Sequence, residues 1–304
     1  WLLPPSNPLT ARVFVNRYWA QAFGRGLVAT AEDFGSQGRM PSHPELLDWL
    51  ATTFVKSGWD AKATQRLIVT SATYRQASVA DEQARGIDPD NTWLARGPSF
   101  RMSTEQIRDS ALAASGLLVR HIGGPSVYPY QPPGVWEALA AGSTYPQSKG
   151  EALHRRSLYT AWKRAAPPPS ATAFDASERL TCIVTRQRTN TPQQALILMN
   201  DPQFVESARV LAEDLVRSDA SPADRVTMGF RRVLSRTPSS SEVDTLMRLH
   251  ATTRQRFVSD AHAAKALLGT GERPPDAVLD VVDVAAWTVV VNTIMNLDEA
   301  VFSR

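Results

Sequence analysis

A glycine-studded loop at residues 25–44 concentrates polar side chains that could take part in chemistry: Glu32, Asp33, Gln37, Arg39 and His43. His43 could act as a general base near pH 7, with Asp33 orienting its ring. The structural interpretation places His43 in the first turn of a helix and lets Asp33 satisfy backbone N–H groups of the loop. One histidine without a paired nucleophile favours the structural interpretation. The sequence therefore offers no catalytic candidates beyond His43 and Asp33.

Arg17 lies inside an otherwise apolar predicted helix, next to Asn16. The guanidinium of Arg17 could bind an anion in a cleft. It could equally form a buried ion pair with Asp33 or Asp175, and this structural role is the favoured one. Breaking such a pair would cost about 3–5 kcal/mol, so sensitivity to mutation at this position would not prove catalysis.

The polar segment at residues 186–191 directly precedes a predicted helix that starts at Pro192. Free N–H groups at a helix N-terminus bind anions, and two arginines would add positive charge. The alternative is plain capping by a threonine that follows an asparagine turn. Both interpretations stay open, and the predicted ligand-binding residues are Arg17, Arg186, Arg188, Asn190 and Thr191.

Metal and thiol chemistry find little support in the sequence. The five histidines show neither His-x₃-His nor His-Glu-x-x-His spacing, so we predict no metal site. Cys182 is the only cysteine, which excludes an intrachain disulfide and a thiolate zinc site. A Cys-x-x-Cys-His motif is absent from the sequence, so we expect no cofactor in this chain.

The composition of the 304 residues is that of a folded protein, with 43% hydrophobic and 21% charged residues. The net charge of +3 is too small to indicate nucleic-acid binding. Twenty-eight of the 33 basic residues are arginine, which reflects either codon bias or recognition of carboxylate, sulfate or phosphate. No apolar run reaches the length of a membrane span.

Helix start and stop signals recur along the chain and predict a mainly α, multi-helical fold. Asn7, Ser42, Asp60 and Ser103 are placed to start helices, and Gly24 to end the first one. Later starts fall at residues 191, 201, 221 and about 239–241. A last helix over about 276–295 is apolar nearly all round, which predicts a central place in the core.

The middle of the chain differs from its flanks. It is rich in Pro and Gly, and we predict a partly extended excursion whose alternating residues 155–162 form a short strand. Its aromatic residues need partners to pack against. The expected organisation is an N-terminal helical group at 1–120, the irregular middle at 121–190 and a C-terminal helical group at 191–304, with one shared core.

Two ordered sequence blocks carry a family resemblance. The first, within residues 7–76, contains NPLTAR, NRYW, GRG, EDFG, PSHPELLDWL and YRQ. The second, within residues 174–202, contains FD, Cys182, RQRTN, TPQQAL and MNDP. Together they resemble the C-terminal domain of unknown function, family 1553, of large exported proteins of planctomycetes and related bacteria. Such proteins commonly carry a cytochrome-c-like domain ahead of it.

The resemblance implies an extracytoplasmic location, periplasmic or at the cell surface, and upstream partner domains that include a haem domain. The start at Trp1 also indicates a segment of a longer polypeptide. Because no complete catalytic constellation is present, we expect a non-catalytic interaction or scaffold domain. The alternative is an enzyme acting on an extracellular polysaccharide, sulfated or unsulfated, which the arginine surplus and the aromatic middle suggest. An anionic glycan is thus a candidate partner, and nucleic acid is not.

Overall fold

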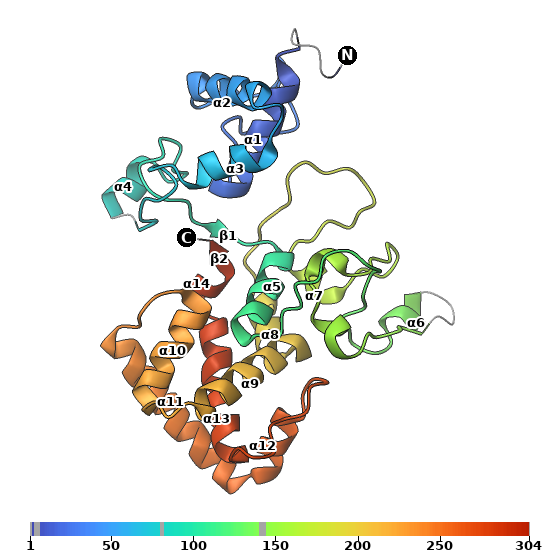
Figure 1. The fold of residues 1–304 in the computed structure, drawn as a ribbon, viewed down its shortest axis with the longest axis vertical. Coiled ribbons are helices and arrows are strands. Elements are labelled where there is room, and N and C mark those ends of the chain that lie inside the picture. The colour runs from blue at the N-terminus through green and yellow to red at the C-terminus, as the bar shows by residue number, and fades with distance from the viewer. Residues whose placement is uncertain (1, 3–6, 80–81, 140–143, 304) are drawn as a thin grey trace. The chain divides into compact units, whose positions relative to one another are not determined.

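The computed structural model describes residues 2, 7–79, 82–139 and 144–303; Trp1 falls outside them. The described residues form fourteen α-helices, two short 3-10 helices and one pair of two-residue strands (Figure 1). The mainly α prediction is therefore confirmed.

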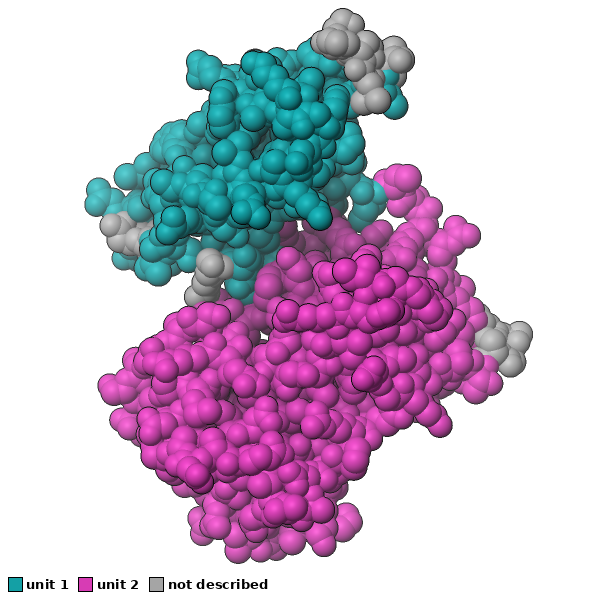
Figure 2. Space-filling model, in the orientation of Figure 1, with its two compact units in different colours: residues 1–101, 183–185, 302–304 teal, residues 102–182, 186–301 magenta. Residues whose placement is uncertain are grey.

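The chain divides into two compact units (Figure 2). Unit 1 comprises residues 1–101, 183–185 and 302–304, and unit 2 comprises residues 102–182 and 186–301. Residues 102–120 thus belong with the middle segment and the C-terminal helices, whereas the sequence analysis grouped them with the first hundred residues. The reason is packing, because the helix that starts at Thr104 lies against the helix that starts at Pro202.

Unit 1 is a small helical body with its own apolar core, formed where the first three helices meet. Val15, Trp19, Leu50 and Phe54 are among its buried side chains. Its elements are α1 (Leu9–Phe23), α2 (Pro44–Lys56), α3 (Ala61–Val69), α4 (Glu82–Ile87) and the antiparallel strands β1 (Phe100–Arg101) and β2 (Phe302–Ser303).

Unit 2 is built around α9 (Pro202–Arg217) and α13 (Val281–Met295), which pack directly on each other (Figure 1). The expected last helix starts later than predicted, at Val281, but it is buried on nearly all sides, as its apolar composition indicates. The other elements are α5 (Thr104–Ser115), α6 (Val135–Leu139), η1 (Gly150–His154), η2 (Ser157–Tyr159), α7 (Pro169–Ala173), α8 (Pro192–Asn200), α10 (Pro222–Leu234), α11 (Ser240–Ser259), α12 (Ala261–Leu268) and α14 (Asp298–Val301).

Most predicted helix starts are confirmed by their hydrogen bonds. Ser103 forms a capping box with Gln106 at the start of α5, and Asp201 and Ser221 accept N–H groups of α9 and α10. The prediction for Ser42 was wrong, because the residue before α2 is His43, whose side chain makes no capping bond. Pro44 fixes that start instead, since its ring presets the backbone for a first helical turn.

The expected strand at residues 155–162 is not formed as a strand. The chain makes the 3-10 turn η2, flanked by isolated bridges of Arg155 with Val119 and of Thr160 with Val127. The Asp109 carboxylate explains the turn, because its Oδ1 accepts both the N–H and the hydroxyl of Ser157, at 2.8 and 2.7 Å.

The aromatic residues of the middle segment do pack together, as expected. Tyr128, Trp136 and Tyr145 form a cluster of edge-to-face rings with centroids 5.1–6.0 Å apart. Within the part of the chain that is described, no helix combines the length and the apolarity that crossing a bilayer requires.

Ile294 tests the central role of α13. Its side chain is completely buried in the main core of unit 2. Ile294→Ala should lower the free energy of unfolding by about 2–5 kcal/mol, because the vacated space cannot be refilled fully. Urea unfolding followed by circular dichroism measures the loss. Val278→Ala, at a side chain that is 92% exposed, is the matched control and should change stability by less than about 0.5 kcal/mol.

Candidate functional site

A narrow cavity opens in unit 2 among α5, α7, the start of α9 and the middle segment. Its volume is about 50 Å³, room for a few water molecules. The lining is aromatic with scattered polar groups: Tyr130, Tyr145, Trp162, Phe174 and Phe204, with Arg108, Arg179, Glu105, Thr104, Ser157, Thr160, Ser170 and Gln203. Concave, mainly aromatic surfaces with a few polar groups are typical of ligand sites.

The floor of the cavity contains Arg108, a buried cation on α5. Its guanidinium donates to Gln203 at 2.7 Å and to the backbone carbonyls of Leu153 and Arg155 at 2.7 and 2.8 Å. Burial lowers the pKa of Arg108, while the nearby Asp109 carboxylate opposes that shift. These bonds fix Arg108 in place, so its main role is to anchor the segment that carries η1.

The rim of the cavity carries one carboxylate, that of Glu105. Arg186 donates to both oxygens of this carboxylate, at 3.0 and 2.8 Å. Burial is the largest single influence and acts to raise the pKa of Glu105, but the hydrogen bond from Arg186, the hydrogen bonds at the start of α5 and the Arg186 charge together outweigh it and leave that pKa below its ordinary value. Glu105 therefore stays ionised and paired at neutral pH, which makes it a poor general acid.

Trp162 and Arg179 form the other side of the rim. The Arg179 guanidinium lies over the Trp162 ring, 4.5 Å from its centroid. Arg179 is exposed and forms no ion pair with any described residue. The indole N–H of Trp162 is buried and finds no acceptor among the described residues. A buried donor without a partner is costly, and this one belongs to a side chain that lines the cavity.

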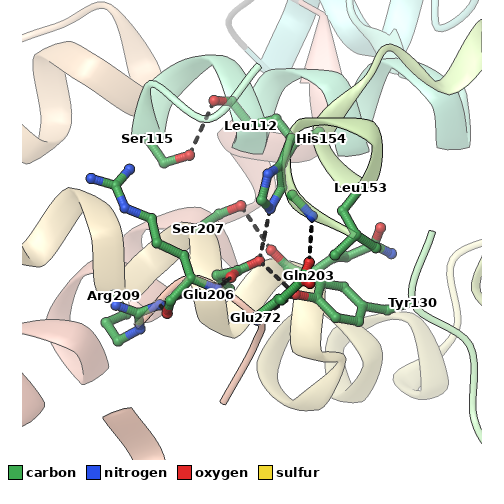
Figure 3. Close-up of polar contacts among 12 residues, drawn as sticks. Leu112, Ser115, Tyr130, Leu153, His154, Gln203, Glu206, Ser207, Arg209 and Glu272 are labelled. Atoms are coloured by element: carbon green, nitrogen blue, oxygen red, sulfur yellow. Dashed lines mark hydrogen bonds and ion pairs between the residues drawn. The ribbon is translucent and has the colours of Figure 1, made fainter. Parts of the chain in front are cut away.

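Behind the cavity, the fully buried carboxylate of Glu206 joins three segments (Figure 3). Its Oε2 lies 2.9 Å from His154 Nε2 and accepts the Tyr130 hydroxyl at 3.0 Å, and its Oε1 accepts the N–H of Arg273 at 2.8 Å. Burial acts to raise the pKa of Glu206, but the hydrogen bonds led by His154 outweigh it and lower that pKa. The Glu206 carboxylate is ionised, both of its oxygens accept hydrogen bonds, and it has no contact with solvent. Its role is therefore to hold these segments together.

A second buried ion pair on α9 continues this network. Arg209 and Glu213 lie 2.6 Å apart, and Arg209 also donates to the carbonyl of Arg273. The turn before Arg273 needs Gly271, whose φ is +93° and whose added Cβ would meet the Glu206 side chain at 2.6 Å. Both pairs therefore fix the turn at residues 271–273 against α9.

Asp201 is a further titratable group, at the start of α9. Burial raises its pKa to about 6, although its Oδ1 accepts the N–H of Gln203 at 3.0 Å. Asp201 does not line the cavity. Its position identifies it as a helix cap that is held in a dry environment.

The polar side chains of the N-terminal loop make local hydrogen bonds. Asp33 accepts the N–H of Gly35 at 2.7 Å, as the structural interpretation predicts. His43 Nδ1 lies 3.0 Å from the hydroxyl of Ser42. Arg17 is exposed and makes no ion pair with a described residue of unit 1, so the expected buried pair with Asp33 is not formed. A catalytic role for His43 and Asp33 stays a prediction.

The residues predicted around the start of α8 already have partners within the protein. Arg186 pairs with Glu105, and the backbone N–H of Thr191 donates to Gln194 at 3.1 Å. Arg188 and Asn190 also have partners of their own. This geometry favours capping over anion binding at that helix start, and ligand binding by these residues stays a prediction.

Sequence reasoning missed the residues that shape the cavity and its support. Glu206, Arg209 and Glu213 are spaced three and four residues apart, which places their charges on one stripe of a helix that is otherwise apolar there. That signal was available in the sequence. Trp162 and Arg179 gave no such signal, because they are seventeen residues apart in an irregular segment. Within the described ranges, no three His, Cys, Asp or Glu side chains are grouped to hold a metal ion.

The structure is that of a mainly helical protein of two units, one of which contains a small cavity with an aromatic lining. A family model described as PSD1, protein of unknown function (DUF1553), matches residues 1–250. The chain belongs to this family. The comparison found no match among curated proteins and none among solved structures.

Glu206→Gln tests the supporting network. Removing the charge weakens the contacts to His154, Tyr130 and the turn at residue 273, so the free energy of unfolding should fall by about 3 kcal/mol. Urea unfolding at pH 7 measures this. Asp214→Asn removes an exposed carboxylate from the same helix and should cost less than about 1 kcal/mol. Equal effects of the two variants would show that Glu206 has no special structural role.

Asp201→Asn tests the raised pKa. In the folded protein Asp201 binds its proton more tightly than in the unfolded chain, so its stabilising contribution is present below pH 4 and is lost as pH rises through about 6. Wild type should therefore lose up to roughly 3 kcal/mol relative to the variant between pH 4 and 7. Asn keeps the cap. Parallel urea-unfolding curves of both proteins at each pH measure this difference, and a constant difference would contradict the shift.

Proposed function

We propose that the chain is a non-catalytic interaction domain of a larger exported protein, and that the cavity of unit 2 is its binding site. The observation that carries this proposal is how the charges of the cavity are used. The Glu105 carboxylate forms an ion pair with Arg186, and the Arg108 guanidinium donates hydrogen bonds to backbone carbonyls and to Gln203. Groups that are paired in this way hold a shape and do not transfer protons.

The second candidate is an enzyme acting on a sulfated extracellular polysaccharide. Glycoside hydrolysis needs two carboxyl groups facing each other, one of them with a raised pKa. Among the described residues that line the cavity, Glu105 is the only carboxylate, and its pKa is lowered. Asp201 has a raised pKa, but it caps α9 and lies outside the lining. The geometry therefore supports binding over hydrolysis.

The proposed setting follows from the resemblance to planctomycete exported proteins. It comprises an extracytoplasmic location and a cytochrome-c-like domain elsewhere in the same polypeptide. Family membership supports this setting. An interaction domain suits it, because such a domain would position the haem domain relative to a partner without doing chemistry itself.

The natural polypeptide that contains this chain allows one combined test. We expect a Soret absorption band from haem bound upstream, and no release of reducing ends from dextran sulfate, alginate or dextran. Absence of the Soret band would remove the proposed setting. Release of reducing ends that disappears in Glu105→Gln would establish an enzyme and overturn the proposal. Asp214→Asn is the control for that variant, because Asp214 is an exposed carboxylate elsewhere in unit 2.

A further inference from the structure

We propose that the cavity of unit 2 binds the acid group of an anionic sugar unit, a carboxylate or a sulfate, between Arg179 and the indole N–H of Trp162. The proposal rests on the proposed function, since it names the ligand of the same site.

The described charged side chains that line the cavity leave one positive charge without an acidic partner, which favours binding of an anion. Arg108 has Asp109 at 3.7 Å, and Glu105 has Arg186 at 2.8 Å. Arg179 is left as the lining cation that has no acidic partner among the described residues. Its stacking on Trp162 holds the guanidinium at the rim, which spares part of the entropy that binding would otherwise cost.

Two sets of polar groups that have no hydrogen-bond partner among the described residues belong to side chains that line the cavity. The buried indole N–H of Trp162 has no acceptor among the described residues, and an acid oxygen in the cavity would supply one. The hydroxyls of Thr104, Thr160 and Ser170 line the cavity and hold no hydrogen bond within the described ranges. A ligand rich in oxygen satisfies these groups, whereas an apolar acid would leave the hydroxyls unmatched.

The size of the cavity sets which part of the ligand enters. About 50 Å³ holds a few waters or one small acid group, and is less than a sugar ring requires. The ring therefore stays at the mouth, where its apolar face contacts the aromatic lining. Rings of this kind pack well on aromatic side chains because both present apolar C–H and π surfaces.

The charge of the surrounding segment favours approach of an acidic ligand. Residues 149–190 contain eight basic and three acidic side chains, a net charge of +5, against +3 for the whole chain. The remainder of the chain is therefore slightly acidic, and positive charge is concentrated in the segment that contains Trp162 and Arg179. Such a local excess raises the association rate of anions and weakens with salt.

Titration calorimetry on the intact chain tests the proposal with defined probes: D-glucuronic acid, glucose 6-sulfate and neutral glucose, then dextran sulfate, unsulfated dextran and a single-stranded DNA oligonucleotide. We expect binding of the two acidic monosaccharides and none of glucose. Arg179→Ala should weaken binding at least tenfold, and Arg179→Lys should restore part of it. Trp162→Phe keeps a ring and removes the N–H donor, so it should weaken binding severalfold.

Arg164→Ala is the matched control, because Arg164 is an exposed arginine of the same segment that does not line the cavity. It should leave the affinity for monosaccharides unchanged. The urea-unfolding midpoint of each variant shows whether the variant is folded. If Arg179→Ala does not fold, Arg179→Lys and the comparison of glucuronic acid with glucose still decide.

Several outcomes would overturn the proposal: binding of glucose as tight as the binding of glucuronic acid, unchanged affinity in Arg179→Ala, or no binding of any monosaccharide or polysaccharide. DNA binding as tight as that of dextran sulfate, with equal loss in Arg164→Ala, would show non-specific polyanion attraction instead. Binding of dextran sulfate without the monosaccharides, lost in Arg179→Ala, would assign the site to a chain and support the proposal. Release of reducing ends would overturn only the non-catalytic function.

Discussion

Unit 2 depends on one buried carboxylate, that of Glu206. It accepts hydrogen bonds from Tyr130, His154 and the backbone at residue 273, and is completely buried. A buried charge is tolerated only when several donors surround it, so these segments must all converge on α9. This requirement explains how a middle segment rich in Pro and Gly is ordered. The Pro and Gly residues of the middle segment disfavour regular backbone hydrogen bonding, and side-chain hydrogen bonds to α9 take its place.

Arg108 also anchors the segment that carries η1. Its guanidinium donates to the backbone carbonyls of residues 153 and 155, and so supplies donors for two buried acceptors at the end of this turn. Buried charges of opposite sign thus both hold the C-terminal end of this turn, at residues 153–155. The cavity lies where this scaffold leaves a gap. Arg179 at the rim differs from these supporting charges, because it stacks on Trp162 and has no acidic partner among the described residues.

Much of the fold could be predicted from the sequence. The caps at Ser103, Asp201 and Ser221 are local, since each side chain bonds an N–H two or three residues away. The burial of α13 follows from a composition that leaves no polar face. The failed strand prediction has a cause that is distant in the sequence. The strand expected at residues 155–162 became a turn because Asp109, nearly fifty residues earlier, caps Ser157.

By itself the sequence determined most of the long helices, several of their starts and the family, because these depend on neighbours in the chain or on ordered motifs. It could not determine the cavity. Trp162, Arg179 and Glu105 come from three separate stretches, and only packing brings them to one rim. The tertiary structure likewise decided which charged side chains form ion pairs within the protein and which do not. The physical reason is that charges pair only over distances of a few ångströms, and the separation of two residues in the sequence does not determine their distance in the fold.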